Sequence, residues 1–317
     1  MINHDSVSPW VELALKLAGE AVNRVQKLSQ KSGAEVVETR DATTGSYRYW
    51  DTETLRIDKE IEKLYIDRLA EKGIDAIVLS EEVGRYKVEP HTAPEIKLDR
   101  PIYFVSDPFD GSLLYKRNIP AFWFSALAIY TRPEKVDVAE PLTAVVVDLS
   151  SRMAYYCDID QSYEGTLDSW GKVDNRKVLK PSNTKSLADA FLETYLMKPH
   201  YMYPTTEQFK FLFNRVKFIL PNGGPCGFCD VASGRIDIYF GFKQPHTDVY
   251  PGLAVAEKAG CMVTTFEGHP VKFENQVEKR YNVICTANPV IHEKVLKLLA
   301  DNNIKDTVGI EEDEKNV

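Results

Sequence analysis

Six acidic residues stand beside expected strand ends or helix starts, where side chains from distant segments can meet: Asp58, Glu81, Glu82, Asp107, Asp110 and Asp248. Each also has a structural interpretation, because a Glu-Glu pair is usually solvated and an Asp before a helix is usually a cap. Converging carboxylates repel one another unless a cation lies between them. Oxygen donors without His or Cys favour Mg²⁺ over zinc. The pattern therefore indicates a magnesium site.

A second chemical signal lies in the turn that begins at Asp107. The Asp107-Pro108 and Asp110-Gly111 steps favour a tight turn, in which two carboxylates three residues apart can converge. Main-chain N–H groups at Gly111 and Ser112, where a helix could start, are suited to bind a phosphate. A divalent cation beside a phosphate site indicates phosphoester chemistry.

Three blocks of this sequence resemble the inositol monophosphatase family. That family lies in a superfamily of Mg²⁺-dependent, lithium-sensitive phosphatases that includes fructose-1,6-bisphosphatases and bisphosphate nucleotidases. The blocks are the acidic pair in Leu79–Glu82, the Asp-Pro-hydrophobe-Asp-Gly-Ser signature of Asp107–Ser112, and the segment from Val231 through Asp248 to Gly260. The second block is the specific one, and the resemblance covers roughly residues 10 to 300.

The resemblance implies a role for each matched residue, with roughly two or three Mg²⁺ ions bound in all. Glu81, Asp107 and the Phe109 carbonyl would hold the first ion. Asp107, Asp110 and Asp248 would hold a second, and Glu82 would approach further metal through water. The catalytic residues would be Asp58, Glu81 and Ser112, of which Asp58 and Ser112 orient the attacking water. Asp110, Gly111 and Ser112 would bind the phosphate.

Departures from the family pattern concern the substrate rather than the metal. Thr247 stands before Asp248 where the family has Trp, and Leu114 replaces a common Asn. Gly241 lies seven residues before Asp248, where inositol monophosphatases tend to carry an acidic residue that binds inositol hydroxyls. These changes argue against a strict inositol enzyme and leave the metal chemistry intact.

Basic and sulfur-containing residues add two open questions. Arg235 and Lys243 are candidate substrate-binding residues that could hold a second phosphate, although each can also be solvated surface. Cys226 and Cys229 have the spacing of a metal or redox pair. Because no second pair exists, we expect them to be small buried packing residues instead.

The elements that would position these residues alternate between strand and helix. A helix is expected from Pro9 through Leu28 with its stop at Gly33, and a second at 58–72. Strands are expected at 76–80, 103–105, 122–130, 142–149 and 153–158. The polar segment from about 160 to 186 is expected to be turn-rich and to separate two halves. The second half predicts strands 190–196, 216–220, 236–241, 261–265 and 281–286 and helices 205–214, 226–234, 248–259 and 289–301.

Such alternation predicts an α+β or α/β layered sandwich with two packed halves, and the resemblance implies the sugar-phosphatase type (αβαβα). We expect an N-terminal α+β half over 1–180 with the acidic motifs. A C-terminal α/β half over 181–305 would complete the substrate site, and 306–317 would form an acidic tail.

Composition limits the partners. The net charge of −8 argues against nucleic acid and anionic membranes as partners. The longest apolar run, 121–130, is about half the length of a membrane span, and the first residues show no secretory signal. Five cysteines, an odd number, are typical of reduced thiols in a cytoplasmic protein. By analogy with the family we expect a homodimer.

The sequence therefore predicts a Mg²⁺-dependent phosphomonoesterase for a small sugar or polyol phosphate. Inositol-1-phosphate and fructose-1,6-bisphosphate are the expected substrate types, which would place the enzyme in carbohydrate metabolism. Two alternatives stay open: a 3′(2′),5′-bisphosphate nucleotidase, and a non-catalytic relative that binds metal or phosphate.

Overall fold

The structure is a computed structural model that describes residues 8–39, 52–93, 100–131 and 140–310. These residues form two compact units. Of these, the first unit holds 8–39, 53–93, 100–131 and 140–177, and the second holds Thr52 and 178–310.

The first unit is built on an eight-stranded sheet. Its strands are β3 (Ala76–Ser80), β4 (Gly84–Lys87), β5 (Ile102–Asp110), β6 (Phe124–Thr131), β7 (Glu140–Asp148), β8 (Met153–Cys157), β9 (Ser162–Leu167) and β10 (Val173–Val178). Their spatial order is β10-β9-β8-β7-β6-β5-β3-β4. Strands β3 and β5 run parallel, whereas the neighbours from β5 to β9 are antiparallel. A separate antiparallel pair joins β1 (Val36–Thr39) to β2 (Glu53–Leu55).

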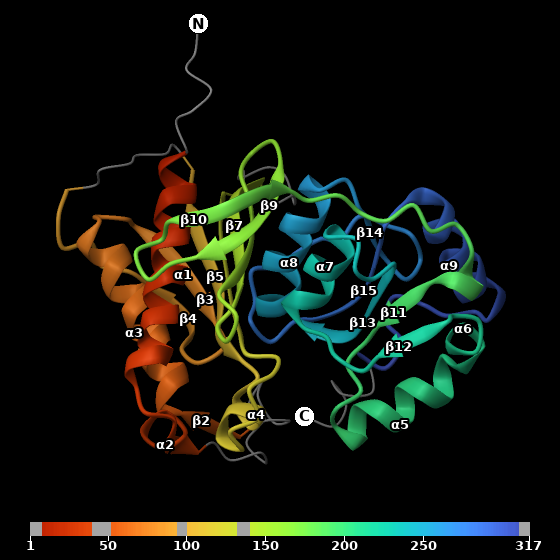
Figure 1. The fold of residues 1–317 in the computed structure, drawn as a ribbon, viewed down its shortest axis with the longest axis horizontal. Helices are drawn as coiled ribbons and strands as arrows, with labels where there is room; N and C mark the ends of the chain where they lie inside the picture. The colour runs from red at the N-terminus through yellow and green to blue at the C-terminus, as the bar shows by residue number, and fades with distance from the viewer. Residues whose placement is uncertain (1–7, 40–51, 94–99, 132–139, 311–317) are drawn as a thin grey trace, which may run out of the picture. The chain divides into compact units, whose positions relative to one another are not determined.

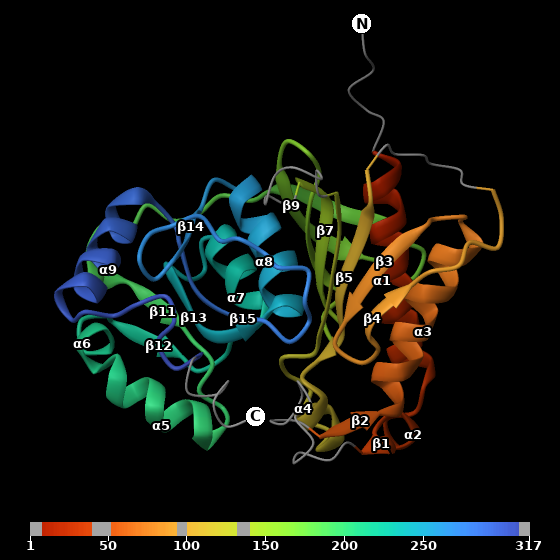
Figure 2. The same ribbon diagram turned by 180° about the vertical axis from the view of Figure 1, so that it is seen from behind.

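Two long helices, α1 (Pro9–Lys27) and α3 (Arg56–Glu71), lie side by side against this sheet, as Figures 1 and 2 show. Helix α1 begins at a proline, which has no N–H to leave unpaired in the first turn. Its apolar positions, Leu17 and Val22 among them, join Ile61 and Leu69 of α3 in one buried core. The short helices α2 (Gln30–Gly33) and α4 (Ser112–Lys116) complete the unit.

The second unit contains a five-stranded sheet in the order β12-β11-β13-β15-β14. The strands are β11 (Phe191–Glu193), β12 (Phe218–Leu220), β13 (Ile238–Pro245), β14 (Met262–Thr265) and β15 (Arg280–Thr286). The helices are α5 (Pro199–Gln208), α6 (Lys210–Phe213), α7 (Pro225–Ala232), α8 (His246–Lys258) and α9 (Pro289–Asp301), with a 3₁₀ turn at Leu187–Asp189.

Helices cover both faces of the five-stranded sheet. Phe240 and Ile284 pack with α6 and α9 in one apolar cluster. Alternate residues of β13 point the other way, so the Tyr239 ring meets Phe228 of α7 at a centroid distance of 4.6 Å. The predicted layered α/β class is confirmed.

Two local predictions were wrong. The segment 160–186 is not simply turn-rich, because β9 and β10 extend the large sheet through it. Strand β10 lies at the sheet edge and is mostly exposed, so it lacks the apolar alternation that identifies a buried strand. The helix expected at 205–214 is two helices, the first of which already begins at Pro199.

Within the described ranges, no helix is long and apolar enough to cross a membrane.

Candidate active site

Parallel pairing of β3 with β5 brings two acidic motifs together. Ser80 lies opposite Ser106, so the residues that follow them, Glu81 and Asp107, are the next neighbours in the register. The Glu81 N–H donates to the Ser106 carbonyl at 3.3 Å. Side chains at the carboxyl ends of adjacent parallel strands meet at one edge, which is where α/β proteins bind ligands.

A bulge in β5 explains how Asp107 and Asp110 can act together. Residues three apart in a regular strand face opposite sides of the sheet. Here Asp107 pairs with Ala126 and Asp110 pairs with Phe124, so β5 carries one residue more than its partner between these pairs. The extra residue offsets the odd spacing and allows both carboxylates to project to one face.

Asp58 lies in the first turn of α3 and connects this helix to the signature block. Its Oδ2 accepts the Leu55 N–H at 2.6 Å, which caps the helix. Its Oδ1 accepts the Ser112 hydroxyl at 2.8 Å. The same hydroxyl oxygen lies 3.1 Å from the Phe109 carbonyl oxygen. The structure therefore brings Asp58 together with Phe109 and Ser112 of the signature block, which lie more than 50 residues later in the sequence.

Gly111 makes the turn before α4 possible. Its φ of 99° is in the left-handed region. A Cβ at this position would lie 2.1 Å from the Phe122 carbonyl oxygen, so no other residue fits without rearrangement. The first N–H groups of a helix have no hydrogen-bond partner within the helix. The main-chain N–H groups at the start of α4, where Ser112 lies, are therefore suited to bind an anion.

Two buried residues that the sequence did not single out hold the acidic pair. Thr54 donates from Oγ1 to Glu82 Oε2 at 2.6 Å, and both side chains are buried. Glu62, one turn after Asp58 on α3, accepts the Val83 N–H at 2.7 Å. The only signal for Glu62 in the sequence is its spacing of four residues from Asp58, which predicts that both lie on the same face of a helix.

The electrostatics fit a site for a cation. Burial, followed by the negative charge of Glu82, raises the pKa of Asp58 well above its ordinary value. The hydrogen bonds from Ser112 and Leu55 act in the opposite direction. Carboxylates that oppose one another's ionisation are stabilised by a positive charge between them.

The donors themselves suit Mg²⁺, because carboxylates, a hydroxyl and a main-chain carbonyl are all hard oxygen ligands. Among the described residues, no group of three or more His, Cys, Asp or Glu side chains could hold a metal ion. Mg²⁺ does not require such a cage, since it usually binds one or two carboxylates and keeps several waters.

The remaining predicted residues belong to the second unit. Asp248 is half-buried in the first turn of α8, beside the Thr247 hydroxyl. Lys243 lies near the end of β13, just before α8. Arg235 precedes β13, and its Nη1 lies 2.7 Å from Ser233 Oγ and 3.7 Å from Asp230 Oδ1. The two basic residues therefore lie at opposite ends of one strand and do not converge.

The cysteine pair has a structural role. Cys226 and Cys229 lie in α7, are buried and carry free thiols, as predicted. Burial raises the pKa of the Cys226 thiol well above its usual value, which disfavours the reactive thiolate.

A cavity of about 690 Å³ in the first unit contains none of the predicted site residues. It is lined by ion-paired side chains of α1 and α3, such as Arg24 with Glu60 and Arg68 with Glu71. The cavity shares no residue with the acidic motifs, and its basic side chains are ion-paired with carboxylates, as Lys59 is with Glu38.

Comparison with known proteins agrees with this geometry. A model of the inositol monophosphatase family matches residues 6–303. The chain belongs to the inositol monophosphatase family. Membership indicates a phosphatase, and the family in general depends on Mg²⁺.

Curated relatives of this family member are distant. A bifunctional NADP phosphatase/NAD kinase of Methanococcus maripaludis is 25% identical over 92% of this chain. This chain spans only about half (49%) of the length of that relative. A fructose-1,6-bisphosphatase/inositol-1-monophosphatase of Methanothermobacter thermautotrophicus is 24% identical, covering 92% of this chain and 96% of that one. The Nus factor SuhB of Pasteurella multocida is 23% identical, covering 83% and 87%.

Solved structures show the same fold. The IMPase of Thermotoga maritima superposes with a TM-score of 0.68 at 19% identity, covering 92% of this chain and 97% of that one. The suppressor protein SuhB of Bartonella henselae gives 0.69 at 16% identity, covering 92% and 98%.

Proposed function

We propose that this family member is a Mg²⁺-dependent phosphomonoesterase that hydrolyses a small sugar or polyol phosphate. The observation that carries the proposal is the Asp58–Ser112 hydrogen bond beside the Phe109 carbonyl, on the signature block of the family. We infer that Glu81, Glu82, Asp107, Asp110 and the Phe109 carbonyl of the first unit would hold the metal. Asp248, in the second unit, stays a metal-ligand prediction from the resemblance. Bound there, Mg²⁺ would polarise the phosphoryl group and make a water more acidic.

The chain's own groups can orient that water. Because the Ser112 hydroxyl donates its proton to Asp58, its oxygen lone pairs can accept a hydrogen bond from a water. Asp58 fixes the hydroxyl in this orientation and is itself held by the Leu55 N–H. The N–H groups of Gly111 and Ser112 would bind the phosphate oxygens and hold the phosphorus in line for attack.

We infer from Gly241 that the substrate pocket differs from that of an inositol enzyme. A Cβ at Gly241 would lie 2.8 Å from Val283 Cγ2 and 3.2 Å from the Gln244 side chain. An acidic side chain at residue 241 therefore requires a shift of its neighbours. This supports a substrate other than inositol-1-phosphate, held in part by Lys243, whereas Arg235 is better explained as a surface residue.

The experiment is phosphate release from a panel of esters with and without Mg²⁺. The panel holds inositol-1-phosphate, fructose-1,6-bisphosphate, adenosine 3′,5′-bisphosphate and NADP, the last because of the relative from M. maripaludis. Asp110→Asn should lower kcat by about 10²-fold or more. Asp168→Asn is the matched control, because Asp168 caps a turn of the same unit through the Trp170 and Lys172 N–H groups.

No release from any ester at any Mg²⁺ concentration would contradict the proposal. It would favour a non-catalytic relative, which the substitutions Thr247 and Leu114 also suggest. The homodimer and a role in carbohydrate metabolism stay predictions from the resemblance, and the cytoplasmic location stays a prediction from the cysteine content.

A further inference from the structure

Strand β2 contacts three segments of the candidate active site through its three residues. The Thr54 hydroxyl donates to a carboxylate of the acidic pair after β3, and the Leu55 N–H donates to Asp58 in the first turn of α3. The first residue of the strand, Glu53, forms an ion pair with Lys116 of α4. Because successive side chains of a strand point to opposite sides, Glu53 and Thr54 reach two different segments.

Helix α4 is held at both ends by this one stretch of chain. The helix has five residues, of which Ser112 is the first and Lys116 the last. The Ser112 hydroxyl donates to Asp58 at 2.8 Å, and Lys116 is ion-paired with Glu53. Residues four apart lie on the same face of a helix, about 6 Å apart along its axis. Two contacts on one face fix the direction of α4, whereas one contact alone would let it turn about Ser112.

Other contacts anchor the middle of α4 to the core of the first unit. The Tyr115 ring packs edge-on against Phe109 at a centroid distance of 5.0 Å, and the Tyr115 carbonyl accepts a hydrogen bond from Gln30 Nε2 at 2.7 Å. The N–H groups of Leu114 and Tyr115 both donate to the Gly111 carbonyl at 3.0 Å. Loss of the ion pair should therefore shift α4 without unfolding it.

The ion pair is partly exposed to solvent, with 35% of the Lys116 side chain and 39% of the Glu53 side chain accessible. Such a pair is screened by salt and adds little to the stability of a whole fold. Its effect is expected on local geometry instead. That geometry matters for Ser112, because a displacement of about 1 Å in a reacting group can lower a rate by about 10²-fold.

We propose that Glu53 is a positioning residue, which holds Lys116 and thereby keeps the Ser112 hydroxyl directed at Asp58. The inference rests on the proposed function, in which Ser112 orients the attacking water. All four residues belong to the first unit. The effect of Glu53 on the chemistry passes through Lys116 and α4.

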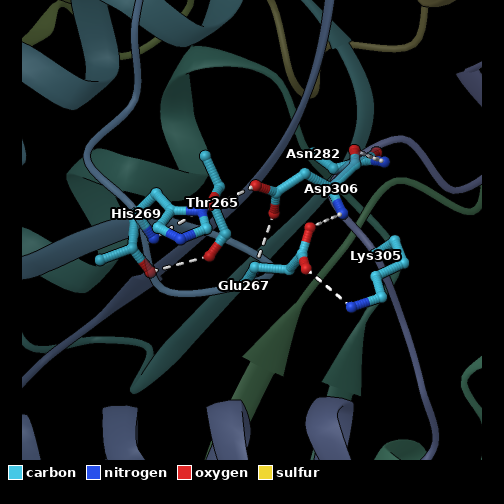
Figure 3. Close-up of polar contacts among 7 residues, drawn as sticks. Thr265, Glu267, His269, Asn282, Lys305 and Asp306 are labelled. Atoms are coloured by element: carbon cyan, nitrogen blue, oxygen red, sulfur yellow. Dashed lines mark hydrogen bonds and ion pairs between the residues drawn. The ribbon is translucent and has the colours of Figure 1, made fainter.

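The test uses the full chain and two variants that break the ion pair, Glu53→Gln and Lys116→Gln. Lys305→Gln is the matched control, because Lys305 forms an accessible ion pair of the same type with Glu267 in the second unit, as Figure 3 shows. Amide exchange over 112–117 is measured by mass spectrometry without Mg²⁺. The turnover number kcat is measured on the best ester of the panel.

Glu53→Gln and Lys116→Gln should both speed amide exchange over 112–117. Both should lower kcat about three- to tenfold, the size expected when a reacting group moves by less than about 1 Å. Lys116→Gln keeps the test decisive if Glu53→Gln does not fold. Lys305→Gln should match wild type in both readouts.

A charge swap separates positioning from direct binding of substrate. Glu53→Lys combined with Lys116→Glu restores an ion pair with reversed signs, so amide exchange and kcat should return to within about twofold of wild type. If Lys116 bound the substrate phosphate instead, a carboxylate at residue 116 would repel the phosphate. The swap would then lower kcat further, and the inference would be wrong.

A double variant tests whether the ion pair acts through the Ser112 hydroxyl. In a Ser112→Ala background, Glu53→Gln should cause no additional loss of kcat, because the hydroxyl that it positions is already absent. An equal loss with and without the hydroxyl would show that Glu53 has only a structural role.

Two further results keep the inference distinct from the proposed function. If Glu53→Gln leaves both amide exchange and kcat at the wild-type values, the ion pair does not position α4, and the proposed function stands. If wild type releases no phosphate from any ester, the proposed function fails and the catalytic part of the inference fails with it. Amide exchange over 112–117 then still shows whether Glu53 holds α4.

Discussion

The Ser112 hydroxyl is the group on which the proposed chemistry depends most directly. Its oxygen lies within hydrogen-bond distance of both Asp58 and the Phe109 carbonyl, although it has only one proton to donate. Donation to Asp58 is the stronger choice, because a carboxylate is the better acceptor. This leaves the lone pairs of the hydroxyl for a water.

Ser112→Ala should lower kcat by about 10²-fold or more, the size expected for loss of a group that assists proton transfer. KM should change little, because main-chain N–H groups would bind the phosphate. Ser112→Thr keeps the hydroxyl and should stay within about tenfold of wild type. Steady-state kinetics with circular dichroism as the folding control tests this, and an alanine variant with near-normal kcat would remove Ser112 from the mechanism.

At the scale of elements, the acidic pair after β3 depends on supports from β2 and α3. Glu82 is buried at 4% exposure and accepts a hydrogen bond from the hydroxyl of Thr54, the middle residue of β2. Glu62 of α3 holds the next N–H, that of Val83. A buried carboxylate needs such donors, because burial removes the water that would otherwise solvate it.

Thr54→Val should lower the free energy of unfolding by about 2 kcal/mol, because the substitution keeps the shape and removes a hydrogen bond to a charged group. Thr54→Ser keeps the hydroxyl and should lower the free energy of unfolding by less than Thr54→Val does. Urea unfolding at neutral pH without added Mg²⁺ measures the difference. Equal midpoints for Thr54→Val and wild type would show that this bond contributes nothing to stability.

At the scale of the whole molecule, a buried histidine links stability to pH. His292 of α9 is 4% exposed, and its two ring nitrogens lie 2.9 Å and 3.0 Å from the hydroxyls of Thr286 and Thr264. Burial lowers its pKa below the ordinary value. The unfolded chain therefore binds a proton at a higher pH than the folded chain does.

The direction in which stability changes with pH follows from this difference in pKa. Above a pH of about 6.5 His292 is neutral in both states, and its contribution to stability is fully present. As pH falls below that value the unfolded state gains the proton first, so stability decreases until the folded pKa is passed. Tm should therefore fall more steeply between pH 7 and pH 5 in wild type than in His292→Gln. Parallel curves would contradict the prediction.

The sequence by itself identified the candidate residues of the first unit's site. Two local features carry this information. Acidic residues follow directly after apolar strands, and the Asp-Pro and Asp-Gly steps at 107–111 favour a turn. Both can be recognised without knowledge of the fold. The layered α/β class followed from the alternation of strand and helix for the same reason.

Only the tertiary structure decided which residues support that chemistry. The bulge in β5 arises from pairing with a partner strand, and Thr54, Glu62 and Glu53 gain their roles from atoms that lie far away in the sequence. The edge strand β10 escaped prediction because exposure removes the apolar signal. The register of a strand and the burial of a side chain are set by contacts between residues far apart in the sequence. They cannot be read from the residues that adjoin them along the chain.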